Sequence, residues 1–210
     1  MTPHPLIEPL RTARIVPVVR TSSAQHAATA CAWLREVGIT IFEITLTIPD
    51  ALSVIRELAS DPALLVGAGT VPSAADAEAC ISAGARFIVS PWVDPALAAP
   101  CRESGACLMM GALTPTEVRA ARQAGADVVK IFPASSVGGP AHIKALRAVF
   151  PTTAFCPTGG VDARNANDYI AAGAAFVGIG GKLVDEAAIA AGRREVVQAA
   201  AREALGIAQA

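Results

Sequence analysis

The sequence predicts a (β/α)8 barrel, the TIM-barrel class of α/β protein, as a single compact domain over residues 1–210. Eight short runs rich in valine and isoleucine alternate with alanine-rich stretches that carry charges at helical spacing. Runs that are apolar on both faces are typical of parallel strands covered by helices. A glycine that permits the left-handed turn at a helix end precedes four of these runs, at Gly38, Gly84, Gly125 and Gly173. Eight strand–helix units give a barrel, whereas a doubly wound open sheet, the alternative, usually has fewer strands.

The elements follow in order along the chain. The predicted strands are Arg14–Val19, Thr40–Leu46, Leu64–Ala68, Arg86–Ser90, Cys107–Gly111, Asp127–Phe132, Thr153–Pro157 and Ala175–Ile179. The predicted helices between them are Ser23–Val37, Asp50–Ala59, Ser73–Ala83, Pro95–Ser104, Thr116–Ala124, Ala141–Val149 and Arg164–Ala172. Hydroxyl side chains that accept a hydrogen bond from a first-turn N–H are expected at Ser22 or Ser23, at Ser73, and at Thr114 or Thr116. The alanine-rich tail beyond Asp185 predicts a terminal helix.

Composition excludes several classes of protein. Hydrophobic residues make up 53% of the chain and charged residues 17%, which excludes a disordered chain. The net charge of −1 offers no basic surface for nucleic acid or for a membrane. No apolar run reaches the ~18 residues of a membrane span, and the first residues do not resemble a signal peptide. The five cysteines form no CxxC pair, and we expect reduced cysteines in a cytoplasmic protein.

Metal chemistry is not favoured by the sequence. The three histidines, His4, His26 and His142, form neither an HxH nor an HExxH pattern. A zinc enzyme usually draws on several histidine, cysteine or carboxylate ligands. We therefore expect no metal site and no cofactor.

Lys130 stands inside the apolar segment ADVVKIFPAS, on the sixth predicted strand. Alternation places Val128, Lys130 and Phe132 on one face. Burial disfavours the charged form of a lysine, and the neutral amine is a nucleophile. The alternative is a structural lysine that reaches the barrel mouth or pairs with a carboxylate. Because barrels carry their function at the carboxyl ends of the strands, we predict a catalytic amine here.

Glu43 lies in the apolar segment IFEITLT, on the second predicted strand. Glu43, Thr45 and Thr47 share one face. If that face is the barrel interior, Glu43 projects into the same cavity as Lys130, where a carboxylate can move protons. The alternative is a buried ion pair with only a structural role. Such pairs are weak stabilisers, and buried ionisable groups gather at functional sites, which favours catalysis.

Glycines and an arginine follow other strands. PTGGV (Pro157–Val161) closes the seventh strand and GIGGK (Gly178–Lys182) closes the eighth. The loops after these two strands form the usual phosphate site of such barrels, because glycine lets backbone N–H groups approach an anion. VGAGTV ends the third strand with Thr70, and Arg20 ends the first. Arg20 can clamp an anion; the alternative is a solvated loop arginine.

A family resemblance rests on eight stretches in chain order: IVPVVR, FEITLTIPDA, VGAGTV, FIVSP, GALTPTE, VVKIFPAS, CPTGGV and VGIGGKLV. They run from Arg14 to Val184, nearly the whole chain, and together they resemble the 2-keto-3-deoxy-6-phosphogluconate (KDPG) and 4-hydroxy-2-oxoglutarate (KHG) aldolase family. The resemblance implies a class I aldolase that forms a Schiff base and cleaves a 2-keto acid to pyruvate and an aldehyde. It also implies a homotrimer and a place in carbohydrate metabolism such as the Entner–Doudoroff route.

The resemblance also implies roles for single residues. Lys130 falls on the Schiff-base lysine and Glu43 on the general acid/base. Substrate contacts are implied around the pyruvyl group at Thr70 and Thr158, in the pyruvate pocket at Pro91 and Phe132, and in a phosphate-binding backbone at Gly159, Gly160, Gly180 and Gly181.

The chain also departs from the family pattern. Many members have an arginine where Thr47 stands; we keep Thr47 as a substrate-binding candidate and infer that Arg20 takes over the anion contact. Lys182 follows Gly181 where members carry a serine. Trp92 follows the SP pair, and Met110 replaces a proline. These differences concern the aldehyde half of the substrate.

Several alternative functions remain open. The substrate, a small-molecule 2-keto acid that yields pyruvate, can be KDPG, its galactonate epimer, KHG or another unphosphorylated acid. A phosphosugar isomerase or epimerase on a similar barrel is a second class, a divalent-metal pyruvate aldolase a third, and a non-enzymatic binding module a fourth. Neither nucleic acid nor a membrane is an expected partner.

Overall fold

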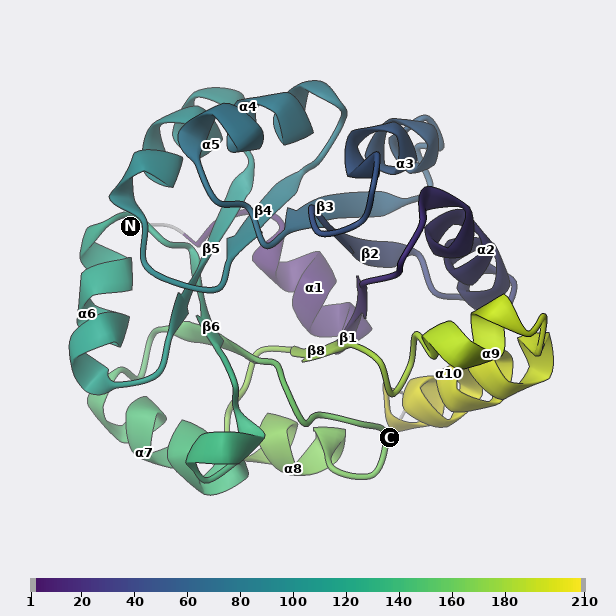
Figure 1. The fold of residues 1–210 in the computed structure, drawn as a ribbon. Helices are drawn as coiled ribbons and strands as arrows, with labels where there is room; N and C mark the ends of the chain where they lie inside the picture. The colour runs from purple at the N-terminus through teal and green to yellow at the C-terminus, as the bar shows by residue number, and fades with distance from the viewer. Residues whose placement is uncertain (1–2, 209–210) are drawn as a thin grey trace.

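The computed structural model describes residues 3–208, and these residues form the predicted barrel (Figure 1). All eight predicted strands are present: β1 Ile15–Val19, β2 Ile41–Thr45, β3 Leu65–Gly69, β4 Phe87–Ser90, β5 Cys107–Ala112, β6 Val128–Ile131, β7 Ala154–Pro157 and β8 Val177–Ile179. They form one eight-stranded sheet in the order β7-β6-β5-β4-β3-β2-β1-β8, and all paired strands are parallel. The ring closes weakly between β7 and β8, through a parallel bridge between Thr158 and Gly178.

Helices surround the sheet in Figure 1. They are α2 Ala24–Arg35, α3 Ala51–Ala59, α4 Ala74–Ser82, α5 Ala98–Ser104, α6 Pro115–Gln123, α7 Pro140–Val149 and α8 Ala166–Ala171, with short 3₁₀ turns at Pro95–Leu97 and Ser135–Val137. The predicted caps are confirmed at Ser23, Ser73 and Thr114, whose side chains accept from first-turn N–H groups. Thr114 and Glu117 form a complete capping box, which fixes where α6 begins.

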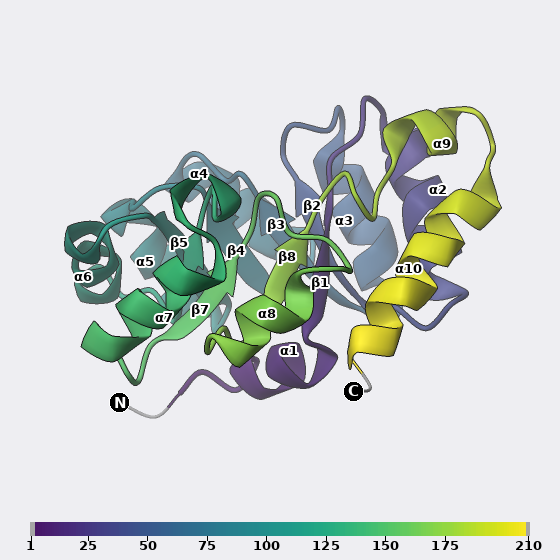
Figure 2. The same ribbon diagram turned by 90° about the horizontal axis from the view of Figure 1, so that it is seen from below.

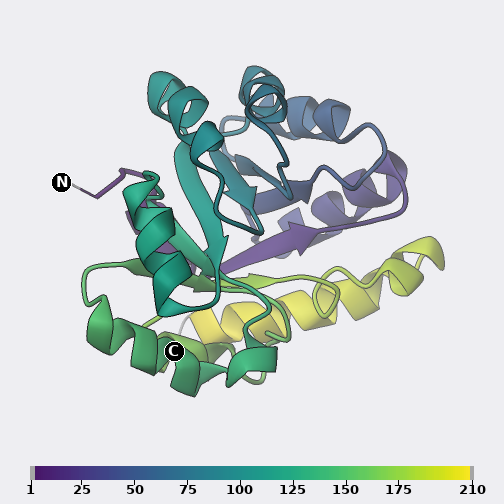
Figure 3. The same cartoon turned by 60° about the vertical axis from the view of Figure 1, so that its left-hand side comes forward.

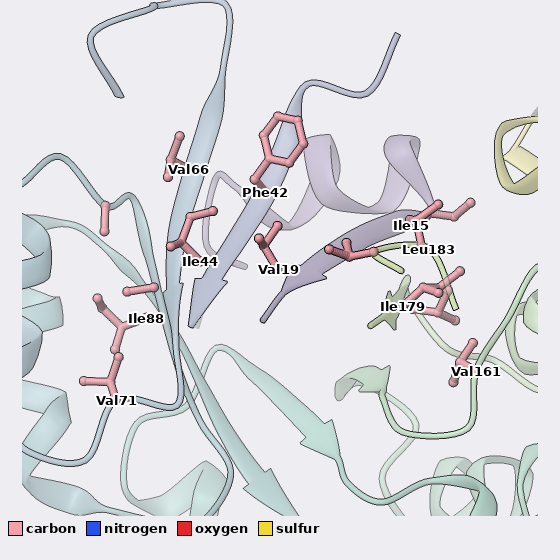
Figure 4. Close-up of a cluster of buried hydrophobic side chains, with 14 of the residues drawn as sticks. Ile15, Val19, Phe42, Ile44, Val66, Val71, Ile88, Val161, Ile179 and Leu183 are labelled. Atoms are coloured by element: carbon pink, nitrogen blue, oxygen red, sulfur yellow. The ribbon is translucent and has the colours of Figure 1, made fainter. Parts of the chain in front are cut away.

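Two apolar layers hold the barrel together. Outward side chains of the strands pack beneath the helices, and Figure 4 shows part of this layer, with Val19, Phe42 and Ile44 fully buried. Burial of each such side chain contributes about 1.5–3 kcal/mol. Inside the barrel, a second cluster that includes Phe87 and Met109 fills the half nearer the amino ends of the strands. The polar interior positions are therefore left at the carboxyl ends.

The chain ends differ from the prediction. A helix that we did not predict, α1 (Ile7–Ala13), inserts Ile7 and Leu10 into the inner cluster and closes the amino end of the barrel (Figure 2). The tail after Asp185 is two helices, α9 (Glu186–Ala190) and α10 (Arg194–Ala208), because Gly192 adopts a left-handed φ of 66° between them. Figure 3 shows α10, in yellow, along the outside of the barrel near β1. Residues 1, 2, 209 and 210 of the predicted domain lie outside the described residues.

The five cysteines are free, as predicted, and all are buried. Burial raises the pKa of the thiols of Cys31, Cys80, Cys101 and Cys156 to about 12 and also raises that of Cys107. Because the thiolate is the reactive form, we expect the native protein at pH 8 to resist a thiol reagent such as Ellman's reagent. All five thiols should react once denaturant unfolds the chain. A rapidly reacting thiol in the native protein would contradict this assignment.

No helix within the described range has the length and apolar character needed to cross a membrane.

Candidate active site

Lys130 and Glu43 meet inside the barrel. Lys130 comes from β6 and Glu43 from β2, and the two side chains converge on the interior as alternation predicted. Lys130 Nζ lies 3.3 Å from Glu43 Oε1, and the two residues are only 6% and 4% exposed. An amine and a carboxylate buried together can share one proton and pass it between them, which suits both nucleophilic and acid–base chemistry.

Gly69 on β3 leaves the space that Glu43 occupies. Gly69 lies beside Thr45 in the register of β2 and β3. A Cβ atom on Gly69 would stand 2.3 Å from Glu43 Oε1, well inside van der Waals contact. The VGAGTV segment therefore contributes to the site in two ways. Gly69 leaves room for the Glu43 side chain, and Thr70 lines the cavity.

Replacing Gly69 with alanine should displace the Glu43 carboxylate from Lys130. We expect kcat to fall about ten- to a hundredfold, because small misplacements of a catalytic group are costly. Stability should fall by about 1–3 kcal/mol, as for other overpacked cores. Kinetics combined with urea unfolding measures both effects. Gly206→Ala, in open space on α10, is the control; a Gly69→Ala enzyme with normal kcat would show that the carboxylate position is unimportant.

A cavity of about 410 Å³ opens above Lys130 at the carboxyl ends of the strands. Its lining contains all the predicted substrate-binding residues except Thr47: Arg20, Thr70, Pro91, Phe132, Thr158, Gly159, Gly160, Gly180 and Gly181. Val18, Val161 and Lys182 complete the wall. The Thr47 hydroxyl instead lies 2.9 Å from Thr45 Oγ1, in the turn that follows β2.

Cationic and backbone groups surround the mouth of this cavity. Arg20 Nη2 donates to Thr70 Oγ1 over 3.0 Å, so that the guanidinium and the hydroxyl form one polar wall. On the opposite side, Gly159 and Gly160 adopt left-handed φ angles of 90° and 75°. Only glycine takes such angles readily, and these turns can present N–H groups to an anion. Lys182 adds a second positive charge at the same rim.

Two buried residues, Cys156 beside Lys130 and Thr45 on the Glu43 face of β2, were not named as site residues by the sequence analysis. Cys156 pairs with Lys130 in the register of β6 and β7 and is buried beside it. Burial is the main cause of its raised pKa, so that it stays a neutral thiol next to the amine. Thr45, fully buried, donates its hydroxyl to the Val19 carbonyl over 3.0 Å and joins the ends of β1 and β2. Alternation on β7 would have placed Cys156 in the interior, as alternation on β2 placed Thr45 on the face of Glu43.

Two departures from the family pattern lie away from the cavity wall. Met110 is fully buried in the outer apolar layer. Trp92 is 47% exposed, and its backbone N–H donates to Ser90 Oγ over 3.3 Å. Among residues 3–208, no group of three or more histidine, cysteine or acidic side chains is arranged to hold a metal ion.

Comparisons with known proteins show the family of the chain. The family model for KDPG and KHG aldolase matches residues 6–200. A 2-dehydro-3-deoxy-phosphogluconate aldolase of Treponema pallidum is 34% identical over 96% of this chain and 97% of its own length. A probable 2-dehydro-3-deoxy-6-phosphogalactonate aldolase of Rhizobium meliloti is 39% identical over 80% of this chain and 81% of its own.

A solved structure gives the same result. The KDPG aldolase of Legionella pneumophila, with pyruvate captured as a covalent carbinolamine intermediate, superposes with a TM-score of 0.84. It is 30% identical and covers 96% of this chain and 97% of that one.

Proposed function

Because the chain belongs to the KDPG and KHG aldolase family, we propose that it cleaves a KDPG-type 4-hydroxy-2-keto acid to pyruvate and an aldehyde through a Schiff base on Lys130. The aldehyde is glyceraldehyde 3-phosphate from KDPG, or glyoxylate from KHG. The observation that carries the proposal is the buried Lys130–Glu43 pair, 3.3 Å apart, of which Lys130 lines a cavity that also contains Arg20, Lys182 and the glycine turns.

The first step requires a neutral amine on Lys130 and a proton on Glu43. With the proton on Glu43, the neutral amine of Lys130 attacks the C2 carbonyl of the substrate and forms a carbinolamine. One amine proton moves to the carbinolamine oxygen, and Glu43 supplies the second proton needed for that oxygen to leave as water. An iminium on Lys130 and an ionised Glu43 result, which leaves the pair ready for bond cleavage.

The second step breaks the C3–C4 bond. The Glu43 carboxylate removes the proton from the C4 hydroxyl, the aldehyde leaves, and the bonding electrons flow into the iminium to give an enamine. Glu43 then returns its proton to C3 of the enamine. Water adds to the resulting pyruvate iminium, and pyruvate departs as the amine and the protonated carboxyl are restored. Atoms and charges balance over the cycle, and no metal is needed.

The rim selects a substrate with an anion at each end. We assign the C1 carboxylate to Arg20 and Thr70, which already contact each other. A distal phosphate would lie against the glycine turns at Gly159–Gly160 and Gly180–Gly181, with Lys182 adding charge. This arrangement favours KDPG or its galactonate epimer over an unphosphorylated acid.

A substrate panel tests the proposal. Pyruvate release is measured for KDPG, its galactonate epimer, KHG and 2-keto-3-deoxygluconate, each with and without chelator. We expect the phosphorylated acids to have the highest kcat/KM and the chelator to have no effect. Loss of activity with chelator would favour a metal-dependent aldolase, and no pyruvate from any substrate would overturn the proposal.

We also propose from the resemblance a cytoplasmic homotrimer that acts in sugar-acid breakdown. Light scattering coupled to size-exclusion chromatography tests the trimer directly.

A further inference from the structure

Glu186 connects two segments that are distant in the sequence. It stands in the first turn of α9, and its carboxylate accepts hydrogen bonds from the N–H and the hydroxyl of Ser22, at 3.1 Å and 2.7 Å. His26 Nδ1, in the first turn of α2, lies 2.6 Å from the same carboxylate. Figure 2 shows α9 beside α2, at the end of the barrel opposite α1. One carboxylate therefore holds the β1–α2 connection against α9.

Both joined segments carry residues of the cavity rim. Arg20 lies two residues before Ser22, in the short connection between β1 and α2. Gly180, Gly181 and Lys182 come before α9 and follow β8, the strand that pairs with β1, so they form the neighbouring part of the rim.

The links from Glu186 to the rim are short and internally bonded. In the first connection, the Thr21 hydroxyl donates to the Ser23 carbonyl over 2.9 Å. In the second, the N–H groups of Leu183 and Val184 donate to the Gly180 carbonyl over 2.8 Å and 2.9 Å. The contacts of Glu186 therefore limit the movement of Arg20 through the first connection and of the Gly180–Lys182 turn through the second.

We propose that Glu186 is a positioning residue that sets the separation between Arg20 and the Gly180–Lys182 turn, and thereby the distance between the two anion sites of the substrate. This inference rests on the proposed function. A substrate with a carboxylate at one end and a phosphate at the other must meet both sites at once. A ligand that carries only the C1 carboxylate does not.

The carboxylate is suited to this role at neutral pH. Partial burial raises the pKa of Glu186, but the hydrogen bonds from His26 and Ser22 outweigh burial and hold the pKa below its usual value. Glu186 is therefore ionised, and a charged acceptor makes the stronger kind of hydrogen bond.

Glu186→Ala in the full-length protein provides the test, with KDPG and pyruvate as the two probes. We expect KM for KDPG to rise about tenfold, the loss typical of one charge-assisted hydrogen bond, with kcat little changed. Pyruvate has one carboxylate and meets only one anion site. The KM for exchange of its methyl protons with solvent deuterium should therefore stay within about twofold of the wild-type value.

Two further variants separate positioning from charge and from general stability. Glu186→Gln keeps an acceptor for Ser22. Its KM for KDPG should therefore lie close to the wild-type value. Glu36→Ala is the matched control, because Glu36 joins the other end of α2 to α10 through Arg194 and Gln198. It should lower the melting temperature without changing KM.

The outcomes are distinct. An unchanged KM for KDPG in Glu186→Ala, an equal rise in both KM values, or a full rise in Glu186→Gln would each overturn the positioning role. If Glu186→Ala does not fold, Ser22→Ala decides, because it removes the hydroxyl donor to Glu186. A higher KM for KDPG with an unchanged KM for pyruvate exchange supports positioning, and an unchanged KM for KDPG overturns it. If the wild-type protein exchanges pyruvate protons but cleaves no substrate, the proposed function is wrong, whatever the Glu186 variants show.

Discussion

Replacing Lys130 with alanine should lower kcat by about four orders of magnitude or more, because the covalent intermediate is lost together with the electron sink that it provides. Neither of the other two lysines can substitute. The chain has three lysines, and Lys144 is exposed on α7 while Lys182 lies at the cavity rim. Of the three lysines, Lys130 alone contacts Glu43, and it also lines the cavity.

Borohydride trapping tests whether Lys130 forms the Schiff base, independently of turnover. Reduction in the presence of pyruvate should add one stable adduct to the wild-type protein, and peptide mapping should place it on Lys130. Lys130→Ala should show no adduct, whereas Lys144→Ala should be trapped like wild type. An adduct-free wild-type protein would favour a phosphosugar isomerase or epimerase, whose proton transfers need no amine adduct.

Stability must be followed in the same variant. Removing one partner of a buried pair typically costs about 3–5 kcal/mol, because the other charge is left uncompensated. Glu43 can offset part of that cost by binding a proton. Circular dichroism and thermal unfolding of Lys130→Ala should therefore show a folded protein with a lower melting temperature. Inactivity in a folded variant assigns the loss to chemistry.

The barrel and its central pair could be predicted because they follow from local rules. Each strand is buried on both faces, so that apolar runs mark all eight. A charged residue within such a run has few structural explanations. Two such residues that face inward in a closed barrel point into the same interior. Strand alternation alone therefore predicts that Lys130 and Glu43 face the same interior, where the structure places them in contact.

Features that depend on long-range packing were not visible in the sequence. The helix α1 has only seven residues, and it is stable because Ile7 and Leu10 pack into the barrel floor. The break at Gly192 was hidden in an alanine-rich stretch that is compatible with a continuous helix. The contact between Glu186 and Ser22 joins residues 164 positions apart, and no local pattern predicts such a pairing.

The rim was predicted less directly than the pair. The glycine turns and Arg20 were marked by their positions after strands, and the cavity contains them. Thr47 followed from the family pattern and the alternation of β2, but β2 ends at Thr45, and the chain then turns. Alternation does not extend beyond the last residue of a strand, which is why Thr47 is absent from the wall.

Glu43→Gln should lower kcat by about a hundred- to ten-thousandfold, the range typical of a lost general acid/base. The amide occupies nearly the same volume but can neither accept the C4 hydroxyl proton nor return a proton to the enamine. Pyruvate-release kinetics give the main measurement. Glu57→Gln, an exposed carboxylate on α3, is the control and should retain full activity.

Borohydride trapping distinguishes Glu43→Gln from Lys130→Ala, because only Glu43→Gln still has the amine that forms the adduct. The amine remains, so borohydride should still capture pyruvate on Lys130, although more slowly because water loss is no longer assisted. Exchange of the pyruvate methyl protons should fall with kcat, since both need proton transfer at carbon or at the C4 oxygen. A trapped but inactive variant shows that Glu43 is essential for the proton transfers that follow Schiff-base formation. If turnover stays within about tenfold of wild type, below the contribution expected of a general acid/base, the proton carrier is another group, and the pair 3.3 Å apart is structural.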